Sequence, residues 1–350
     1  MGIAYEADLE NRIDAVLALA MLYGITGKNE ARNIAFSISR PNIKAAQFAD
    51  VVAGFYGGRA AGGFAMIGMP ERGLPADASS LILATLQRKT TEGGPAYTSN
   101  ISRVLDTADN AVLTRNQLLA QNDGNATIVL AGPATGMAKL LGLYGSRPQL
   151  EAKVKQLVVA IGAFPSGPPD TSIKADVAAA RKLFAEWPTP LVAVGAEVGA
   201  ALPYPGSSIE KDFSWSPAHP VADAYRVNQR MPYDAPASAL AAMLYAAHPD
   251  DGYFKLSAPG TITVLDDGRV QFTAGAGGKH RYLIADPAQT ELVTNLYTGF
   301  VSAQPVRGGP GRGRGAAPAQ QQQQQQQTPA PQAAPPKPTD SVPKPAEAKP

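Results

Sequence analysis

Short apolar runs of β-prone residues alternate with amphipathic helical stretches over the first two thirds of this chain. This alternation is typical of parallel βαβ units, whose strands are covered by helices on both faces of a sheet. It predicts a doubly wound, mostly parallel α/β sheet flanked by helices. The predicted strands are Ile3–Ala7, Asn33–Ser39, Phe64–Met69, Ala126–Ala131, Leu157–Gly162 and Leu191–Gly195. The predicted helices among them are Arg12–Tyr23, Ile43–Tyr56, Ala108–Gln121, a stretch from Thr135, and Asp176–Trp187.

The pattern changes after Gly199, where a loop is followed by two predicted helices, Val221–Arg230 and Pro236–Ala247. Two short β-prone runs then flank the turn sequence DDG, which is a strong signal for a small antiparallel hairpin near the C-terminal end. The hairpin strands are Thr261–Leu265 and Val270–Thr273, and a last helix is predicted at Pro287–Phe300.

The C-terminal segment has a different composition from the rest of the chain. It contains GGPGRGRG, an unbroken glutamine run at Gln320–Gln327 and a proline-rich end, without apolar periodicity. Such a segment cannot bury enough apolar surface to offset the entropy lost on ordering. We therefore predict one folded domain, residues 1–302, followed by a disordered Gly/Arg-, Gln- and Pro-rich tail, residues 303–350.

Composition excludes several functional classes. The 350 residues carry a net charge of +2, so no global field favours nucleic acid or an anionic membrane as partner. The absence of cysteine excludes disulfides, thiol nucleophiles and thiolate metal sites. No apolar run approaches the roughly 18 residues that span a bilayer, and no signal peptide is evident. We expect a cytoplasmic protein, or a secreted or periplasmic one if the true start lies upstream, with the choice between monomer and homo-oligomer open.

Carboxylates gather at predicted strand ends, where ligands bind in open parallel sheets. Glu6 and Asp8 alternate at the end of the first strand, and Asp14 follows in the next helix. Converging carboxylates repel unless a cation, hydrogen bonds or a shared proton stabilises them, and oxygen-only sets suit calcium. The alternative is that Asp14 merely favours the helix dipole while Glu6 and Asp8 are solvated.

Several sequence segments, in order along the chain, resemble the inosine-uridine preferring nucleoside hydrolases. YEADLENRIDAVLALAML is similar to that family's opening, in which an Asp-x-Asp pair ends the first strand and an Asp-Asp pair precedes Ala-Leu-Ala-Leu. VLAGPAT resembles its Gly-Pro-Leu-Thr-Asn segment, VVAIGAF its Met-Gly-Gly strand, and MPYDAPASAL its late His-Asp segment. The similarity runs from Met1 to about Ser302.

The resemblance implies hydrolysis of the N-glycosidic bond of a ribonucleoside by a calcium-bound water. Carried over by position, Asp8 is the catalytic base and a calcium ligand, with Thr135 and Asp234 as the other metal ligands. The expected partner is a small nucleoside or ribose-like molecule, with neither nucleic acid nor membrane as a partner of the folded domain. The implied substrate-binding residues are Glu6, Asp14, Asp170, Ser172 and Tyr233.

The sequence departs from the family pattern at the positions that matter most for calcium. Ala15 replaces the second member of the Asp-Asp pair, and Arg12 places a positive charge nearby. Gly136 replaces the asparagine after threonine, and Tyr233 replaces the histidine before Asp234. These changes define a degenerate active site and make calcium a doubtful cofactor.

Two functions remain open. One is a calcium-dependent N-ribosyl hydrolase. The other is a catalytically silent homologue that acts as a ribose- or nucleoside-binding module or as an interaction module, with Arg12 supplying the charge of the ion. The sequence argues against two other classes of protein, the Ser-His-acid hydrolases and the dinucleotide-binding proteins. Only three histidines exist and no Gly-x-Ser-x-Gly elbow occurs, which argues against a Ser-His-acid hydrolase. The glycine pairs never form a dinucleotide-binding fingerprint after a strand. His219 and Tyr233 flank the segment that caps the family's active site, so contact with a leaving base is a further hypothesis for both.

Overall fold

The parallel part of the sheet is built around β1 (Gly2–Ala7). In the computed structural model, which describes residues 1–57, 66–72 and 80–305, β1 pairs with β2 (Arg32–Ile38) on one side and β4 (Ala126–Ala131) on the other. All six residues of β1 and of β4 are buried, as expected for strands covered on both faces. The carboxyl end of β1 therefore lies among neighbouring strand ends.

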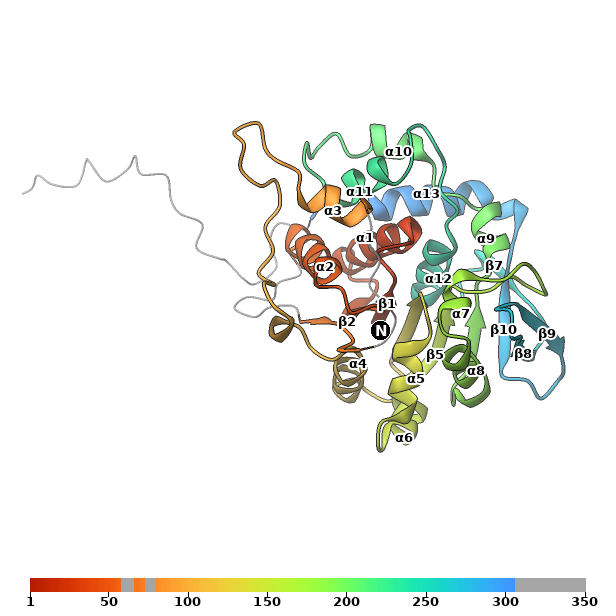
Figure 1. Ribbon diagram of the computed structural model, residues 1–350. Helices are drawn as coiled ribbons and strands as arrows, with labels where there is room; N and C mark the ends of the chain where they lie inside the picture. The colour runs from red at the N-terminus through yellow and green to blue at the C-terminus, as the bar shows by residue number, and fades with distance from the viewer. Residues whose placement is uncertain (58–65, 73–79, 306–350) are drawn as a thin grey trace, which may run out of the picture. The chain divides into compact units, whose positions relative to one another are not determined.

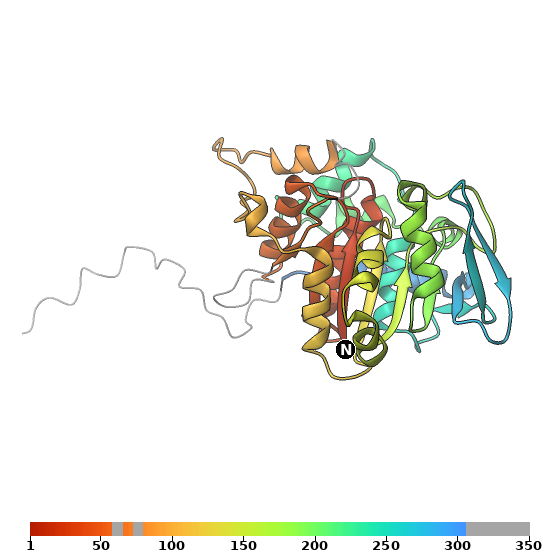
Figure 2. The ribbon, with the colours of Figure 1, turned by 60° about the horizontal axis from the view of Figure 1, so that its bottom comes forward.

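The described residues form a ten-stranded sheet in the order β3-β2-β1-β4-β5-β6-β10-β8-β9, with β7 pairing β10. The remaining strands are β3 (Ile67–Gly68), β5 (Val154–Val159), β6 (Leu191–Ala193), β7 (Phe254–Leu256), β8 (Gly260–Val264), β9 (Val270–Ala274) and β10 (His280–Ala285). Pairing is parallel from β3 through β10, whereas β8, β9 and β7 are antiparallel. The predicted doubly wound sheet and the C-terminal hairpin are both confirmed, and Figure 2 shows the hairpin at one side of the sheet.

Helices cover both faces of the sheet (Figure 1). One face packs against α1 (Ile13–Gly27), α2 (Ile43–Phe55), α11 (Pro220–Asn228), α12 (Ser238–Ala247) and α13 (Thr290–Val301). The other packs against α4 (Asn110–Leu119), α5 (Thr135–Gly142), α6 (Ser146–Lys153) and α8 (Val177–Glu186). Shorter helices are α3 (Ser80–Leu86), α7 (Thr171–Ala175), α9 (Ala196–Ala201) and α10 (Gly206–Lys211), with 3-10 turns at Val104–Asp106 and Pro287–Gln289.

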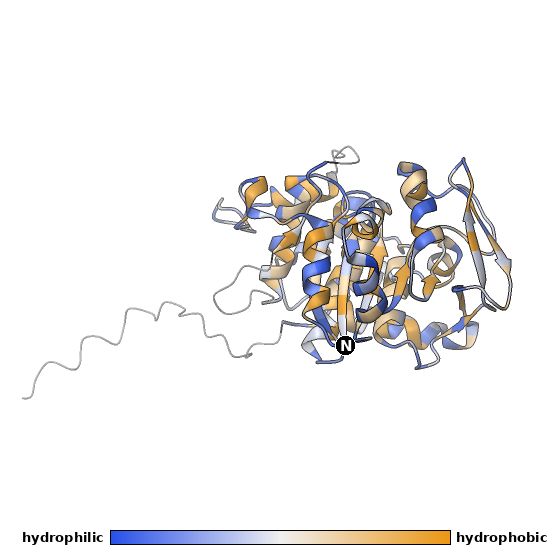
Figure 3. Ribbon diagram, turned by 90° about the horizontal axis from the view of Figure 1, so that it is seen from below, coloured by the Kyte–Doolittle hydropathy of each residue, from blue (hydrophilic) through white to orange (hydrophobic). Residues whose placement is uncertain are grey.

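The hydrophobic core has two parts, one on each face. Ile3, Tyr5 and Ala7 of β1 join the cluster on the α1 side, whereas Ala4 joins the cluster on the α4 side. This is the alternation that the strand period requires. In Figure 3, apolar and polar residues alternate along the outer helices. Each of these helices therefore has an apolar face that can pack against the core.

Helix α1 is buried almost all round, because it lies between β2 and the helices α11, α12 and α13. A Cβ added at Gly24 would lie 2.2 Å from the backbone oxygen of Phe300, so only glycine permits this close contact with α13. The tight packing fixes the position of the first turn of α1, where Arg12 and Asp14 are found.

Some predicted boundaries fall outside the described residues. Of the strand predicted at Phe64–Met69, residues 64 and 65 are not described, and the observed strand is Ile67–Gly68. The predicted tail begins at 303, and only residues 303–305 of it are described. No helix in the described ranges has the length and apolar character needed to cross a bilayer.

Candidate functional site

The first carboxylate of the site, Glu6, is enclosed within the protein. It is 1% exposed, and its Oε2 accepts a hydrogen bond of 3.1 Å from Asn110 Nδ2 while Oε1 has no partner. Burial raises the pKa of Glu6 to about 8, so the side chain is mostly protonated at neutral pH. Gly136 packs against this carboxyl group, since an added Cβ would lie 2.2 Å from Oε1. Glycine at position 136 thus makes room for Glu6.

Asp8, the expected base and calcium ligand, is buried just beyond β1 and surrounded by donors. Arg40 Nε donates to Oδ2 at 3.0 Å, and Asn11 Nδ2 lies within 3.2 Å of both oxygens. The backbone N–H of Glu10 donates to Oδ1 at 3.2 Å. A carboxylate has about four lone-pair sites, and protein donors fill those of Asp8.

Arg12 and Asp14 form the second ion pair of this region. The Arg12 Nε and Nη2 atoms lie 3.1 and 2.8 Å from the two oxygens of Asp14, which is the planar, two-bond pairing typical of arginine and carboxylate. Asp14 Oδ2 also accepts from the Ser238 hydroxyl at 3.2 Å and from Ala239 N at 2.9 Å. Arg12 Nη2 and Nη1 reach the hydroxyl of Ser238 and the carbonyl of Ala160 at 2.9 and 2.5 Å.

The guanidinium of Arg12 therefore joins three elements: the start of α1, the start of α12 and the end of β5. Burial opposes its charge, but Asp14 beside it and Asp170 further away raise the pKa of Arg12 above its ordinary value, so it stays charged. The side chain of Arg12 is 17% exposed and is therefore largely buried.

Three further candidates lie on the loops after β4 and β5. Asp170 caps α7 by accepting from Ile173 N, and its Oδ2 accepts from Gly162 N, both at 3.0 Å. Thr135 begins α5, and its hydroxyl donates to Asp176 at 2.7 Å. Ser172 is buried in α7. Asp170 is thus the member of this group that acts electrostatically on Arg12.

The last two candidates precede α12. Tyr233 stacks on Tyr225 with ring centroids 4.4 Å apart and donates its hydroxyl to Tyr225 O at 2.8 Å. Asp234 is exposed, and its Oδ1 accepts from Gly206 N at 2.8 Å. The residue of the α12 start that bonds to Asp14 is Ser238, four positions after Asp234. The structure therefore brings Asp14, Arg12 and Ser238 together. Asp234 instead accepts a hydrogen bond from the start of α10.

Helix α11 is held by a polar and aromatic cluster beside this region. His219 is the N-cap of α11, with Nδ1 accepting from Ala222 N at 3.4 Å. Aromatic rings of Phe55, Tyr56, Phe213 and Trp215 surround it. Burial lowers the pKa of His219 to about 3, so the ring is neutral at pH 7. Because Nδ1 accepts, Nε2 carries the proton and faces Tyr56 Oη, 3.2 Å away.

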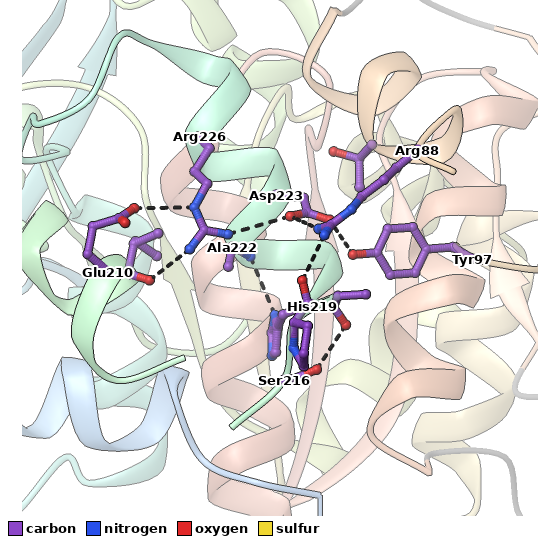
Figure 4. A network of polar contacts seen from close by, with 12 residues as sticks. Arg88, Tyr97, Glu210, Ser216, His219, Ala222, Asp223 and Arg226 are labelled. Carbon is purple, nitrogen blue, oxygen red and sulfur yellow. Dashed lines mark hydrogen bonds and ion pairs between the residues drawn. The ribbon is translucent and has the colours of Figure 1, made fainter. Parts of the chain in front are cut away.

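The same helix carries a network of charges, shown in Figure 4. Asp223 accepts from Arg88 and Tyr97, and Arg226 Nη1 lies 3.5 Å from it. Arg226 also pairs with Glu210 on α10 at 3.2 Å. These contacts connect α11 to the segment after α3 and to α10. His219 thus has a structural role as helix cap, and contact with a base stays a prediction.

The donor set does not fit a calcium ion. Calcium takes about six to eight oxygen ligands, yet the oxygens of Asp8 and Asp14 already accept bonds from protein donors. Ala15, which the resemblance predicts at the position of a metal-binding acid, is fully buried in the core. Across residues 1–57, 66–72 and 80–305, no group of three or more His, Asp or Glu side chains is arranged to hold a metal ion.

The sheet order and the helices on both faces match the fold of nucleoside hydrolases of known structure. A plant nucleoside hydrolase superposes with a TM-score of 0.63 at 17% identity, over 86% of this chain and 99% of the other. The inosine-uridine preferring nucleoside hydrolase from Bacillus anthracis gives 0.58 at 13% identity, over 85% and 99%. The type III effector protein XopQ, complexed with adenosine diphosphate ribose, gives 0.58 at 12%, over 87% and 93%. The sequence matches no protein-family model and no curated protein.

The polar partners of Arg12 and of the three carboxylates were not anticipated from the sequence. Asn110, Arg40, Ser238 and the carbonyl of Ala160 come from four separate parts of the chain. For Ser238 a local signal existed: serine is a common residue at a helix start, and SALAAML continues the apolar helix pattern of the family segment. The others are brought together only by tertiary structure.

Proposed function

We propose that the chain binds a small ribose-bearing molecule, such as a nucleoside or adenosine diphosphate ribose, at the carboxyl end of β1, β4 and β5 without calcium and without hydrolysing it. The observation that carries this proposal is the Arg12 guanidinium, which bonds Asp14, Ser238 and the Ala160 carbonyl. An arginine holds carboxylates together as a cation does, but it cannot lower the pKa of a water as a metal ion does.

Arg12 supplies the binding contact in this proposal. A guanidinium has five N–H donors, and four hydrogen bonds of Arg12 are accounted for, so one donor remains for a ligand. Asp170 lies near enough to act on the charge of Arg12. The remaining N–H donor of Arg12 suits a ribose hydroxyl as its acceptor. The fold supports the ligand class, since its neighbours include nucleoside hydrolases and a complex with adenosine diphosphate ribose.

The competing function is hydrolysis by a calcium-bound water at Asp8. It requires Asp8 and Asp14 to exchange their arginine partners for an ion. Because a buried carboxylate and arginine stabilise each other strongly once both are desolvated, this exchange is costly.

The test measures binding and turnover on the full chain. Isothermal titration with ribose, inosine and adenosine diphosphate ribose is performed in EDTA and in calcium, and base release is followed by chromatography. We expect equal affinity in both buffers, no base release, and loss of affinity in Arg12→Gln. Arg269→Gln, on the exposed hairpin, is the control and should bind normally. Calcium-dependent base release by the parent protein would replace this proposal by the hydrolase.

A further inference from the structure

A cavity lies between the loop after β5, the start of α9 and the end of β10. Its volume is about 330 Å³, near the lower end of the range for ligand pockets, roughly 300–1,000 Å³. Its lining includes Phe164, Glu197, Val198, Tyr282, Leu283 and Ile284. Most of this lining is apolar, with a single carboxylate among the residues that form it.

The cavity walls are fixed by specific contacts. Phe164 stacks on Tyr282 with ring centroids 5.4 Å apart, and Phe272 meets Tyr282 edge-on at 4.9 Å. The backbone N–H of Phe164 donates to Glu197 Oε2, and Phe272 N donates to Pro165 O, both at 3.0 Å. The loop is thus tied to α9 and to β9. A cavity held in this way needs little rearrangement to receive a ligand.

Glu197 gives the cavity its chemical character. Glu197 is an exposed residue, yet partial desolvation of its carboxyl group raises the pKa of Glu197 above its ordinary value. The surroundings therefore disfavour an unpaired negative charge. The backbone N–H groups of Phe164 and of Glu197 itself both interact with the carboxylate. In the part of the chain described here, Glu197 has no cationic partner. Lys255 on β7 lies opposite Ile284 of the cavity lining in the strand pairing. Its ammonium group is paired with Asp286 at 2.9 Å. The carboxylate is therefore available to an incoming donor.

We propose that this cavity binds a small organic cation, with an ammonium or amidinium group on Glu197 and an apolar body against Val198, Tyr282 and Leu283. The cation supplies the charge that Glu197 lacks, and the body removes apolar surface from water. Ile284, which is 40% exposed, lies at the rim and covers part of the bound molecule. The residues that line this site differ from those of the ribose site proposed at Arg12.

The test uses benzamidine as the cationic probe and benzyl alcohol as a neutral molecule with the same ring. Binding is followed on the full chain by NMR line broadening and by titration calorimetry. We expect benzamidine to bind, and Glu197→Gln to weaken it about tenfold or more, the usual effect of losing a charge-assisted hydrogen bond. The amide oxygen introduced by Glu197→Gln can still accept from Phe164 N, so the fold should be retained. Ile284→Ser, at the rim, should weaken binding by a smaller factor.

Glu291→Gln, an exposed acid in the first turn of α13, is the matched control and should bind benzamidine as the parent does. Equal binding of benzamidine and benzyl alcohol would overturn the proposed cation selectivity. Unchanged binding in Glu197→Gln would overturn the assignment of the site. Because the ribose site is tested with other ligands and with Arg12, failure here leaves that proposal untouched.

Discussion

Arg12 and Asp14, two residues apart at the start of α1, are held in a two-bond ion pair with N–O distances of 3.1 and 2.8 Å. Arg12 is also the residue whose carbonyl receives the first backbone bonds of α1, from Ala15 and Val16. The backbone of Arg12 thus begins the helix while its side chain crosses to α12 and to the end of β5. One residue therefore couples the helix start to the candidate site.

Arg12→Ala should destabilise the fold, because Asp14 would remain buried without a counter-charge. Breaking a buried ion pair by removing one partner costs about 3–5 kcal/mol, and the 17% exposure of Arg12 places this case toward the lower value. Urea unfolding of parent and variant at pH 7 measures the loss. Arg269→Ala, whose pair with Asp267 is exposed, should change stability by less than about 1 kcal/mol. Equal effects of the two variants would contradict the role of Arg12.

The calcium question is tested by replacing Arg12 and Ala15 together with aspartate. We expect no calcium-induced rise in the melting temperature of the parent, since Asp8 and Asp14 are already engaged. The Arg12→Asp, Ala15→Asp variant frees Asp14 and adds two acids, so calcium should raise its melting temperature. Because Ala15 is fully buried, the variant should be less stable than the parent in EDTA. Equal calcium shifts in both proteins would mean that Ala15 does not lie at the metal position of the family.

The fold was predictable because its signals are local. Strand β4 was predicted at its observed bounds, Ala126–Ala131, since a short apolar run ends there at Gly132-Pro133. Strand β10 was missed: only His280 and Leu283 of its six residues are buried, so the strand lacks the pattern of a buried run. It enters the sheet by pairing with β6, a contact between residues about 90 apart.

The site was less predictable, because its pairings join distant segments. Glu6, Asp8 and Asp14 could be recognised at a strand end and a helix start. Their partners could not, since Arg40 and Ser238 acquire their roles only when β2 and α12 pack beside β1 and α1. Local sequence does not encode which arginine meets which carboxylate.

Glu6 should make stability fall as pH rises. Its pKa is about 8 in the folded protein and 4.5 ordinarily, so between these values the folded state binds the extra proton. Stability contributed by this group is fully present below pH 4.5 and is lost toward pH 8, by about 1.4 kcal/mol per pH unit at most. Glu6→Gln keeps an acceptor for Asn110 and removes the titration, so its unfolding free energy should not fall in this way. Parallel pH profiles for parent and variant would contradict the buried, protonated Glu6.

Asp223 should stabilise the segment between α3 and α4 locally. Asp223→Asn leaves Arg88 and Arg226 with a weaker partner, and both arginines are more than a third exposed, so we expect a loss of only about 1–2 kcal/mol. Hydrogen exchange should increase most at residues 88–97, which the Arg88 and Tyr97 contacts hold to α11. Glu210→Gln removes only the exposed pair with Arg226 and should leave that segment protected. A uniform increase across the domain in Asp223→Asn would show that the network supports the whole fold instead.

His219 should give a pH dependence of the opposite sign to that of Glu6. Burial lowers the pKa of His219 to about 3 from 6.5, so between these values the unfolded state binds the extra proton. The stability contributed by the neutral ring is fully present above pH 6.5 and is lost as pH falls toward 3, by up to about 1.4 kcal/mol per unit. Between pH 4.5 and 6.5 the effects of Glu6 and His219 on stability oppose each other, which flattens the pH profile of the parent.

His219→Asn retains a helix cap and removes the titration, so its stability should rise relative to the parent as pH falls through this window. The comparison is made by urea unfolding at pH 4.5 and 6.5, and an unchanged difference between the two proteins would mean that His219 is charged or exposed when folded. His280, also buried with a lowered pKa, is present in both proteins and cancels in the difference.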